Sequence, residues 1–183
     1  MWNEQIIMML LEGIKDTLYM TLTSTLIGYV IGLPMGILLT VTDKDGIHPN
    51  AAVYKVLDVI ANLIRSVPFL ILLIVLIPFT RFLIGRSYGP TATIVPLVIA
   101  AAPYIARMVE SSLKEVDAGV IEAARSMGAS NFTIVTKVML VEARTSLIVG
   151  ATISLGTILG YSAMAGTVGG GGLGDIAIRY GYT

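Results

Sequence analysis

The sequence contains no cysteine and only one histidine. Without cysteine there is no disulfide framework, no thiolate metal site and no thiol nucleophile. Charge is also scarce, because 13% of the residues are charged, whereas a soluble domain usually carries about 25%. This composition argues against an ordinary soluble domain. The 12 basic and 12 acidic residues balance, so no net charge favours binding to nucleic acid.

Patterns for catalysis and nucleotide binding are missing as well. No G-x-x-x-x-G-K-[ST] phosphate loop occurs, so we do not expect this chain to bind ATP. Gly169, Gly171 and Gly174 formally match G-x-G-x-x-G, but they follow an apolar run rather than a strand. We predict instead that Gly169 to Gly172 form a close-packed turn at the outer membrane face. No catalytic or metal-binding constellation lies in an apolar run, and His48 stands in a polar loop, so neither an enzyme nor a metal site is expected.

Long apolar runs fill much of the chain. Four gaps between charged residues, which follow Asp16, Arg65, Arg86 and Arg144, enclose 26, 15, 20 and 30 uncharged residues. A spanning helix needs about 20 apolar residues. The second gap is short, and it gains length from residues 56–64 before it or 82–84 after it. The pattern predicts an all-α, polytopic membrane helix bundle with four spanning helices in a single domain, residues 1–183.

The basic residues are distributed unequally between the two sides of such a bundle. Eight lie in or beside the second and fourth exposed segments, and four lie on the other side. Since basic loops stay in the cytoplasm, we predict that the long 105–145 segment is cytoplasmic and that the N-terminus is outside. The four gaps hold no ionisable acid, base or histidine, which argues against an ion-coupled carrier.

Two of the expected spans carry small residues at helical spacing. Gly28, Gly32 and Gly36 recur every four residues, and Gly156 and Gly160 repeat the spacing in the last span. Such a face lets another backbone approach closely. We predict helix packing at these five glycines, either static packing within the bundle or contact with a partner that moves.

The stretch from Tyr54 to Arg65 is amphipathic. Its polar face carries Lys55, Asp58, Asn62 and Arg65. Such a helix can lie at the inner membrane surface or line a water-filled vestibule. The pattern favours a solvated polar face.

The 105–145 segment has the start and stop signals of two short helices. Asp117 can cap a helix from Ala118 to Met127, and Gly128 suits a left-handed position at its end. Ser130 or Asn131 can cap the next helix. We therefore predict a helix, a sharp turn and a second helix, and we refer to residues 117–130 as the 117–130 turn. Val120, Ala124 and Met127 give the first helix an apolar face, which needs a cover if it is exposed to cytosol.

Glu122-Ala123-Ala124, followed after three residues by Gly128, resembles the signature cytoplasmic loop of bacterial ABC-importer permeases. That signature ends in I-x-L-P, where this chain has Val138-Met139-Leu140-Val141. The similarity to the methionine-uptake branch of these permeases extends over nearly the whole chain. It includes four further segments, Arg65 to Phe69, Ala101 to Arg107, Glu110 to Leu113 and Gly166 to Asp175. Members of that branch continue past the glycine-rich segment into a fifth spanning helix, whereas this sequence ends with Arg179 to Thr183.

The resemblance implies a type I ABC-importer permease in the bacterial inner membrane. It implies a permease homodimer, a separate ATP-binding ABC subunit that holds ATP and magnesium, and an extracytoplasmic lipoprotein that delivers methionine; no cofactor is implied in this chain. Coupling to the ATPase subunit is then assigned to Glu122, Ala123, Ala124, Arg125, Gly128 and Ala129. The substrate contacts are not identified. A structural membrane subunit, a passive channel, or a permease for another amino acid or peptide are the alternatives.

Overall fold

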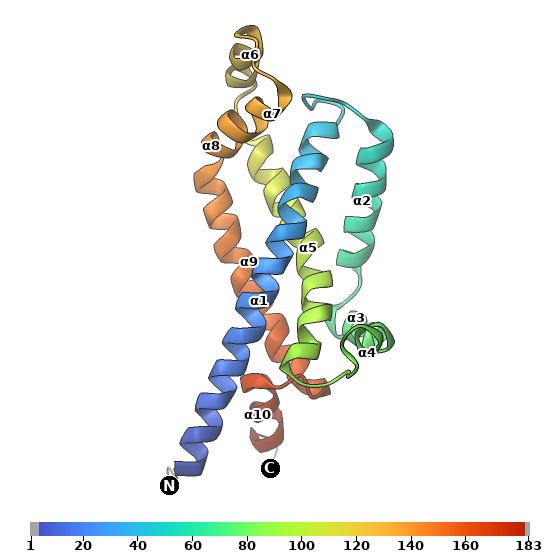
Figure 1. The fold of residues 1–183 in the computed structure, drawn as a ribbon, viewed down its shortest axis with the longest axis vertical. Helices are drawn as coiled ribbons and strands as arrows, with labels where there is room; N and C mark the ends of the chain where they lie inside the picture. The colour runs from blue at the N-terminus through green and yellow to red at the C-terminus, as the bar shows by residue number, and fades with distance from the viewer. Residues whose placement is uncertain (1–3, 182–183) are drawn as a thin grey trace. The chain divides into compact units, whose positions relative to one another are not determined.

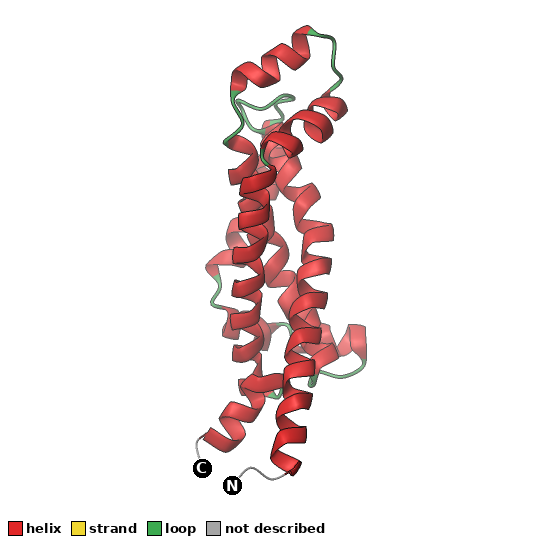
Figure 2. Cartoon of the chain, turned by 90° about the vertical axis from the view of Figure 1, so that its left-hand side faces the viewer, coloured by secondary structure: helices red, strands yellow, loops and turns green. Residues whose placement is uncertain are grey.

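The computed structural model describes residues 4–181, and all regular structure in this range is helical, as the all-α prediction requires (Figure 2). The elements in chain order are α1 (Glu4–Thr42), α2 (Ala51–Ser66), α3 (Phe69–Val75), α4 (Ile77–Ile84), α5 (Pro90–Lys114), α6 (Ala118–Ser126), α7 (Asn131–Thr133), the π-helix η1 (Ile134–Met139), α8 (Leu140–Glu142), α9 (Arg144–Ala165), the 3-10 helix η2 (Gly166–Val168) and α10 (Gly172–Gly181) (Figure 1).

Three helices in the described range are long and apolar enough to cross a membrane: α1, α5, and α9 with its extension to Val168. With 39 residues, α1 measures about 58 Å at ~1.5 Å per residue. It is therefore longer than the roughly 30 Å of hydrocarbon that a span must cross. These three helices correspond to the first, third and fourth predicted spans.

The second predicted span is not a single straight helix. α2 ends at Ser66, α3 begins at Phe69, and the two helices are bent by 102° relative to each other. Pro68 lies in the break with an extended conformation (φ −55°, ψ 134°). Proline lacks the N–H that a continuous helix needs and disfavours helical geometry in the residue before it. The number of spans is thus three, or four if the bent pair counts as one broken span, because hydropathy alone does not register a proline break.

The chain forms two compact units that share the three long helices. The first unit comprises Met1–Gly28, Ser66–Ala101 and Leu155–Thr183. In it, the rings of Phe69 and Tyr161 stack with 4.5 Å between their centroids. The N–H of Leu173 in α10 donates to Thr17 Oγ1 in α1 at 2.9 Å, so the start of α10 is joined to α1.

The second unit comprises Tyr29–Arg65 and Ala102–Ser154. It contains the ends of α1 and α5, α2 up to Arg65, and the 117–130 turn. Its core includes Leu39, Ile105 and Ile134, each with no exposed surface. This unit holds every residue to which we assigned a coupling role, so it positions the candidate site.

Candidate functional site

The predicted caps of the 117–130 turn are present. The Asp117 side chain accepts a hydrogen bond from the Gly119 N–H at 2.7 Å and starts α6. Ser130 Oγ accepts from the Thr133 N–H at 3.3 Å and starts α7. The helix, turn and helix predicted from these residues are therefore confirmed, with α6 ending at Ser126, one residue earlier than expected.

Gly128 has the predicted left-handed conformation, with φ +81°. Its N–H donates to the Arg125 carbonyl at 3.0 Å, and the Ala129 N–H donates to the Ala124 carbonyl at 3.1 Å. A Cβ at Gly128 would meet nothing within 4 Å. Glycine is thus required here by backbone conformation rather than by lack of space.

The coupling residues inferred from the resemblance differ in exposure. Glu122, Ala123, Arg125 and Gly128 are exposed, and Ala129 is half-buried. Ala124 is only 5% exposed. Its side chain is covered within the chain.

Two large apolar side chains are exposed in this turn and in the adjacent α7. Met127 is 82% exposed and Phe132 is 77% exposed. Met127 was expected on an apolar face, whereas Phe132 was not singled out from the sequence. The sequence feature that could have identified Phe132 is its position, two residues after the Ser130 cap, in the short segment that follows α6.

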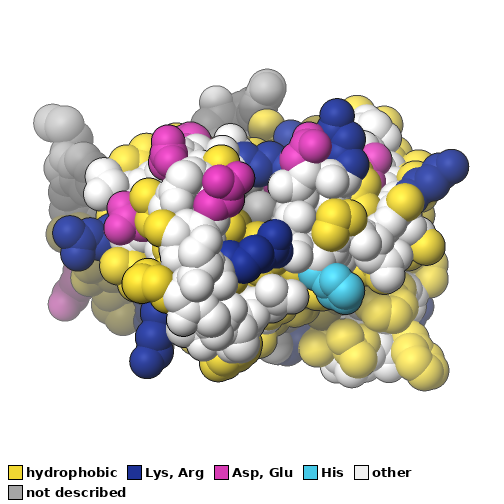
Figure 3. All heavy atoms as spheres, turned by 90° about the horizontal axis from the view of Figure 1, so that it is seen from above, with side chains coloured by type: hydrophobic (Ala, Val, Ile, Leu, Met, Phe, Trp, Pro, Cys, Tyr) yellow, Lys and Arg dark blue, Asp and Glu magenta, His cyan; other side chains and the backbone are white. Residues whose placement is uncertain are grey.

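Arg125 also makes a contact within the chain. Its Nη2 donates to the backbone carbonyl of Ile47 at 2.7 Å. Ile47 lies in the α1–α2 loop, which we define as residues 43–50. The view onto the α6 end shows acidic and basic side chains mixed with hydrophobic ones on this face (Figure 3).

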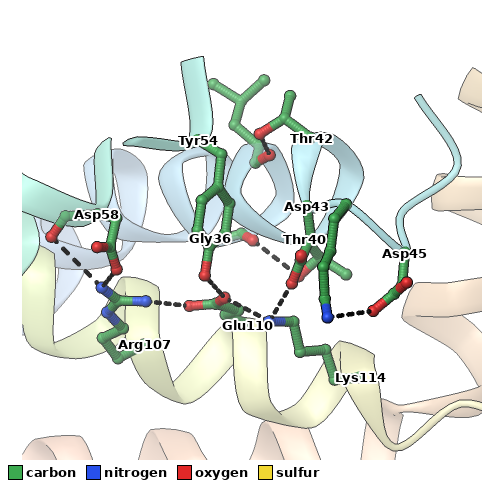
Figure 4. A network of polar contacts seen from close by, with 12 residues as sticks. Gly36, Thr40, Thr42, Asp43, Asp45, Tyr54, Asp58, Arg107, Glu110 and Lys114 are labelled. Atoms are coloured by element: carbon green, nitrogen blue, oxygen red, sulfur yellow. Dashed lines mark hydrogen bonds and ion pairs between the residues drawn. The ribbon is translucent and has the colours of Figure 1, made fainter. Parts of the chain in front are cut away.

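A cluster of five charged side chains connects α5 with α2 and with the end of α1 (Figure 4). This charge cluster consists of Asp43, Asp58, Arg107, Glu110 and Lys114. Arg107 pairs with Asp58 and donates to Asn62 Oδ1 at 3.1 Å. The predicted solvated face is confirmed for Asn62, which is exposed, whereas Asp58 is half-buried beside Arg107, a partner on α5 that lies 49 positions away in sequence.

Glu110 is the most enclosed member of the charge cluster, with its side chain 7% exposed. Its carboxylate accepts from Arg107 Nη1 at 2.7 Å, from Lys114 Nζ at 2.8 Å and more weakly from Tyr54 Oη at 3.4 Å. A buried carboxylate requires such partners, because an unpaired charge is costly away from water. Sequence reasoning included Glu110 only within the resemblance and did not identify its role.

Asp43, which follows the last residue of α1, completes the charge cluster. Lys114 Nζ lies 2.5 Å from Asp43 Oδ2. The hydrogen bond from Lys114 lowers the pKa of the Asp43 carboxyl below its ordinary value, because it stabilises the charged form. The end of α1 is therefore tied to the end of α5 by an ion pair.

Two of the three α1 glycines at this spacing, Gly32 and Gly36, lie against the backbone of α5. Gly28 is buried, and a Cβ at Gly32 would stand 2.7 Å from the Ala102 carbonyl oxygen. A Cβ at Gly36 would stand 2.5 Å from the Ala106 carbonyl oxygen. In α9 a Cβ at Gly156 or Gly160 would meet nothing within 4 Å, so these two glycines do not pack against another helix within residues 4–181 of this chain.

The glycine run that follows α9 forms the close-packed turn that we predicted. Gly169, Gly171 and Gly172 have positive φ angles. The Gly170 N–H donates to the Ala165 carbonyl at 3.0 Å, and the Gly89 N–H donates to the Gly169 carbonyl at 2.9 Å. This turn has a structural basis independent of any nucleotide. Among residues 4–181, no group of three or more His, Asp or Glu side chains is arranged to hold a metal ion.

A family model described as "Binding-protein-dependent transport system inner membrane component" matches residues 8–182. Two similar relatives are a probable D-methionine transport system permease protein of Vibrio cholerae and the D-methionine transport system permease protein of Escherichia coli K12. The first is 48% identical over 174 residues, which is 95% of this chain and 77% of the relative. The second is 52% identical over 164 residues, which is 90% of this chain and 76% of the relative.

Solved structures agree in fold. A native crystal form of the inward-facing MetNI methionine ABC transporter contains a chain that is 51% identical, with a TM-score of 0.97 over 99% of this chain and 84% of that chain. An amino acid ABC transporter crystallised with histidines has a TM-score of 0.77 at 23% identity, covering 98% of this chain and 82% of that chain. The second likeness concerns the fold alone.

Proposed function

The chain belongs to the family of inner membrane components of binding-protein-dependent transport systems, and from this premise we propose that it is the permease subunit of an ATP-driven methionine importer. The proposal rests on the comparison with permeases named for D-methionine transport, to which the chain is 48% and 52% identical over 95% and 90% of its length. The fold of an inward-facing methionine ABC transporter chain supports it.

The energy source is a separate ATP-binding ABC subunit, which binds ATP and magnesium and docks on the 117–130 turn. Glu122 and Ala123 are exposed on this turn. Met127 and Phe132 project beside them and supply the large apolar area that typically anchors a protein interface. We therefore replace the buried Ala124 in the proposed docking surface with Met127 and Phe132.

Transport needs a path that a small bundle does not enclose alone. We propose a homodimer of this chain, with a path between the two copies. The 117–130 turn faces the cytoplasm of the bacterial cell, the N-terminus faces outward, and an extracytoplasmic lipoprotein delivers methionine. Closure of the paired ATPase subunits then moves the turns and rocks the spans between inward-open and outward-open states.

Reconstitution tests this function. The chain, its co-expressed ABC ATPase and its binding protein are placed in proteoliposomes with ATP and radiolabelled L- or D-methionine. We expect uptake that requires ATP and the binding protein and that unlabelled methionine competes away. ATP-driven uptake of another amino acid without methionine uptake would contradict the substrate. Uptake without ATP would contradict the importer.

A pair of variants tests the docking surface. Met127→Asp with Phe132→Asp should release the ATPase subunit during purification, because both charges would enter an apolar contact. The control is Lys137→Ala, which removes an exposed charge from η1 and should leave the complex intact. Full retention of the ATPase by the double variant would refute this surface.

A further inference from the structure

The α1–α2 loop is folded firmly against the end of α1. The His48 N–H donates to the Val41 carbonyl at 3.0 Å, and the Asn50 N–H donates to the Thr42 carbonyl at 2.9 Å. A Cβ at Gly46 would stand 2.5 Å from the Val41 carbonyl oxygen, so the loop backbone lies directly on the last turn of the helix. A displacement of this loop therefore displaces α1.

Side-chain pairs fasten the same region to α5 and α2. Asp43, at the start of the loop, pairs with Lys114 at the end of α5. Lys114 and Arg107 share Glu110, and Arg107 reaches Asp58 in α2. The loop is thus held by the charge cluster at its first residue and by backbone hydrogen bonds along its length.

Arg125 is the side chain on α6 that contacts this loop. Its guanidinium donates a charge-assisted hydrogen bond of 2.7 Å to the Ile47 carbonyl. The two residues are 78 positions apart in sequence. The contact joins α6 to the end of α1 by a route other than the covalent connections through α5 and through η1.

A cleft of about 580 Å³ separates α6 from the loop apart from this contact. Lys44, Gly46, Lys114, Ile121 and Arg125 are among its lining residues. The Arg125 side chain crosses this space.

We propose that Arg125 is a positioning residue that carries movement of the 117–130 turn to the α1–α2 loop, and so to α1 and α2, through the Ile47 carbonyl. The inference rests on the proposed function, since it requires an ATPase that moves the turn. It differs from the role implied by the family resemblance, in which Arg125 contacts the ATPase subunit itself.

The test separates coupling from docking in the purified complex of this chain with its ABC ATPase. Arg125→Ala should retain the ATPase, while methionine uptake per ATP hydrolysed falls by about threefold or more, the range seen when a coupling contact is lost. Arg125→Lys, whose ammonium can also donate to the carbonyl, should restore much of the ratio. The control Lys137→Ala should leave retention and the ratio unchanged.

Two results would overturn the proposal. Loss of the ATPase from Arg125→Ala, as expected for the Met127 and Phe132 variants, would make Arg125 a docking contact. An unchanged uptake-to-hydrolysis ratio would show that the contact transmits nothing.

A spectroscopic readout keeps the test independent of the transported substrate. The chain has no cysteine, so a nitroxide can be placed specifically at Lys44→Cys, an exposed loop position. The spectrum of the label should change when ATP binds the labelled complex that retains Arg125, and Arg125→Ala should abolish this change. A persistent ATP-dependent change in Arg125→Ala would refute the inference. If the labelled complex that retains Arg125 shows the spectral change but no methionine uptake, only the proposed substrate is refuted.

Discussion

Gly36 lies directly against the backbone of Ala106, since a Cβ added to the glycine would stand 2.5 Å from the Ala106 carbonyl oxygen. One turn earlier, Gly32 lies against Ala102 in the same manner. The contact positions advance by four residues in both helices, so α1 and α5 run in the same direction along this contact. The absence of a side chain at these glycines allows the two backbones to approach closely.

Gly36→Ala should destabilise the chain even though alanine is the better helix former. The added methyl group would overlap α5, and such overpacking costs about 1–3 kcal/mol. Thermal unfolding of the detergent-purified chain measures the effect. The control is Gly150→Ala in α9, where the new Cβ would stand 3.6 Å from Met108 Cβ in ordinary contact. Equal stability of the two variants would contradict the close approach.

Substitutions at Gly128 should follow left-handed backbone preference rather than side-chain size. The position has φ +81° and open space for a Cβ. Gly128→Asn should keep most uptake, because asparagine tolerates this conformation, whereas Gly128→Val and Gly128→Leu should uncouple ATP hydrolysis from uptake. Uptake and hydrolysis are measured at matched membrane levels. Better transport by the valine variant than by the asparagine variant would exclude this explanation.

Glu110→Ala should be destabilising. The variant leaves Arg107 with Asp58 and Lys114 with Asp43 as their remaining carboxylate partners, and loss of a hydrogen bond to a charged group costs about 1.5–3 kcal/mol. Glu110→Gln should cost less, since its amide oxygen still accepts a hydrogen bond. The control is Lys44→Ala, which removes an ion pair with Asp45 whose side chains are 85% and 82% exposed and should barely change the unfolding temperature. Similar losses in Glu110→Ala and Lys44→Ala would argue against the buried network.

The Asp43–Lys114 pair predicts a pH dependence of stability. The folded-state pKa of Asp43 lies below its ordinary value because Lys114 donates a hydrogen bond to the carboxylate. Its stabilising contribution is therefore fully present above about pH 4 and is lost as the pH falls through the lowered pKa. Asp43→Asn should be less stable than the unmodified chain at pH 7, and the difference should shrink below about pH 4. If the stability difference between Asp43→Asn and the unmodified chain stays constant with pH, the ionised Asp43 carboxylate is not the cause of that difference.

The helix caps and the left-handed turn were predicted correctly, because they depend on interactions between residues close in sequence. Asp117 and Ser130 cap helices through backbone groups two and three residues away, and Gly128 takes the conformation that ends α6. The break within the second span was not predicted, because a count of apolar residues ignores the missing N–H of Pro68.

Contacts between distant segments could not be predicted in this way. Asp58 and Arg107 are 49 positions apart, and nothing in the amphipathic pattern around Asp58 distinguishes a side chain that faces water from one that faces a cation. The glycine spacing in α1 and α9 looks alike in sequence. Gly32 and Gly36 have the backbone of α5 within reach, whereas Gly156 and Gly160 have nothing within 4 Å in the described part of the chain.

The sequence by itself determined the apolar helices, the caps and the left-handed turn, because these depend on composition and on groups a few residues apart. The tertiary structure decided which glycines pack, that Ala124 is covered while Met127 and Phe132 project, and that Arg125 reaches Ile47. These outcomes depend on which helix faces lie opposite one another, and that arrangement follows from the packing of segments far apart in the chain.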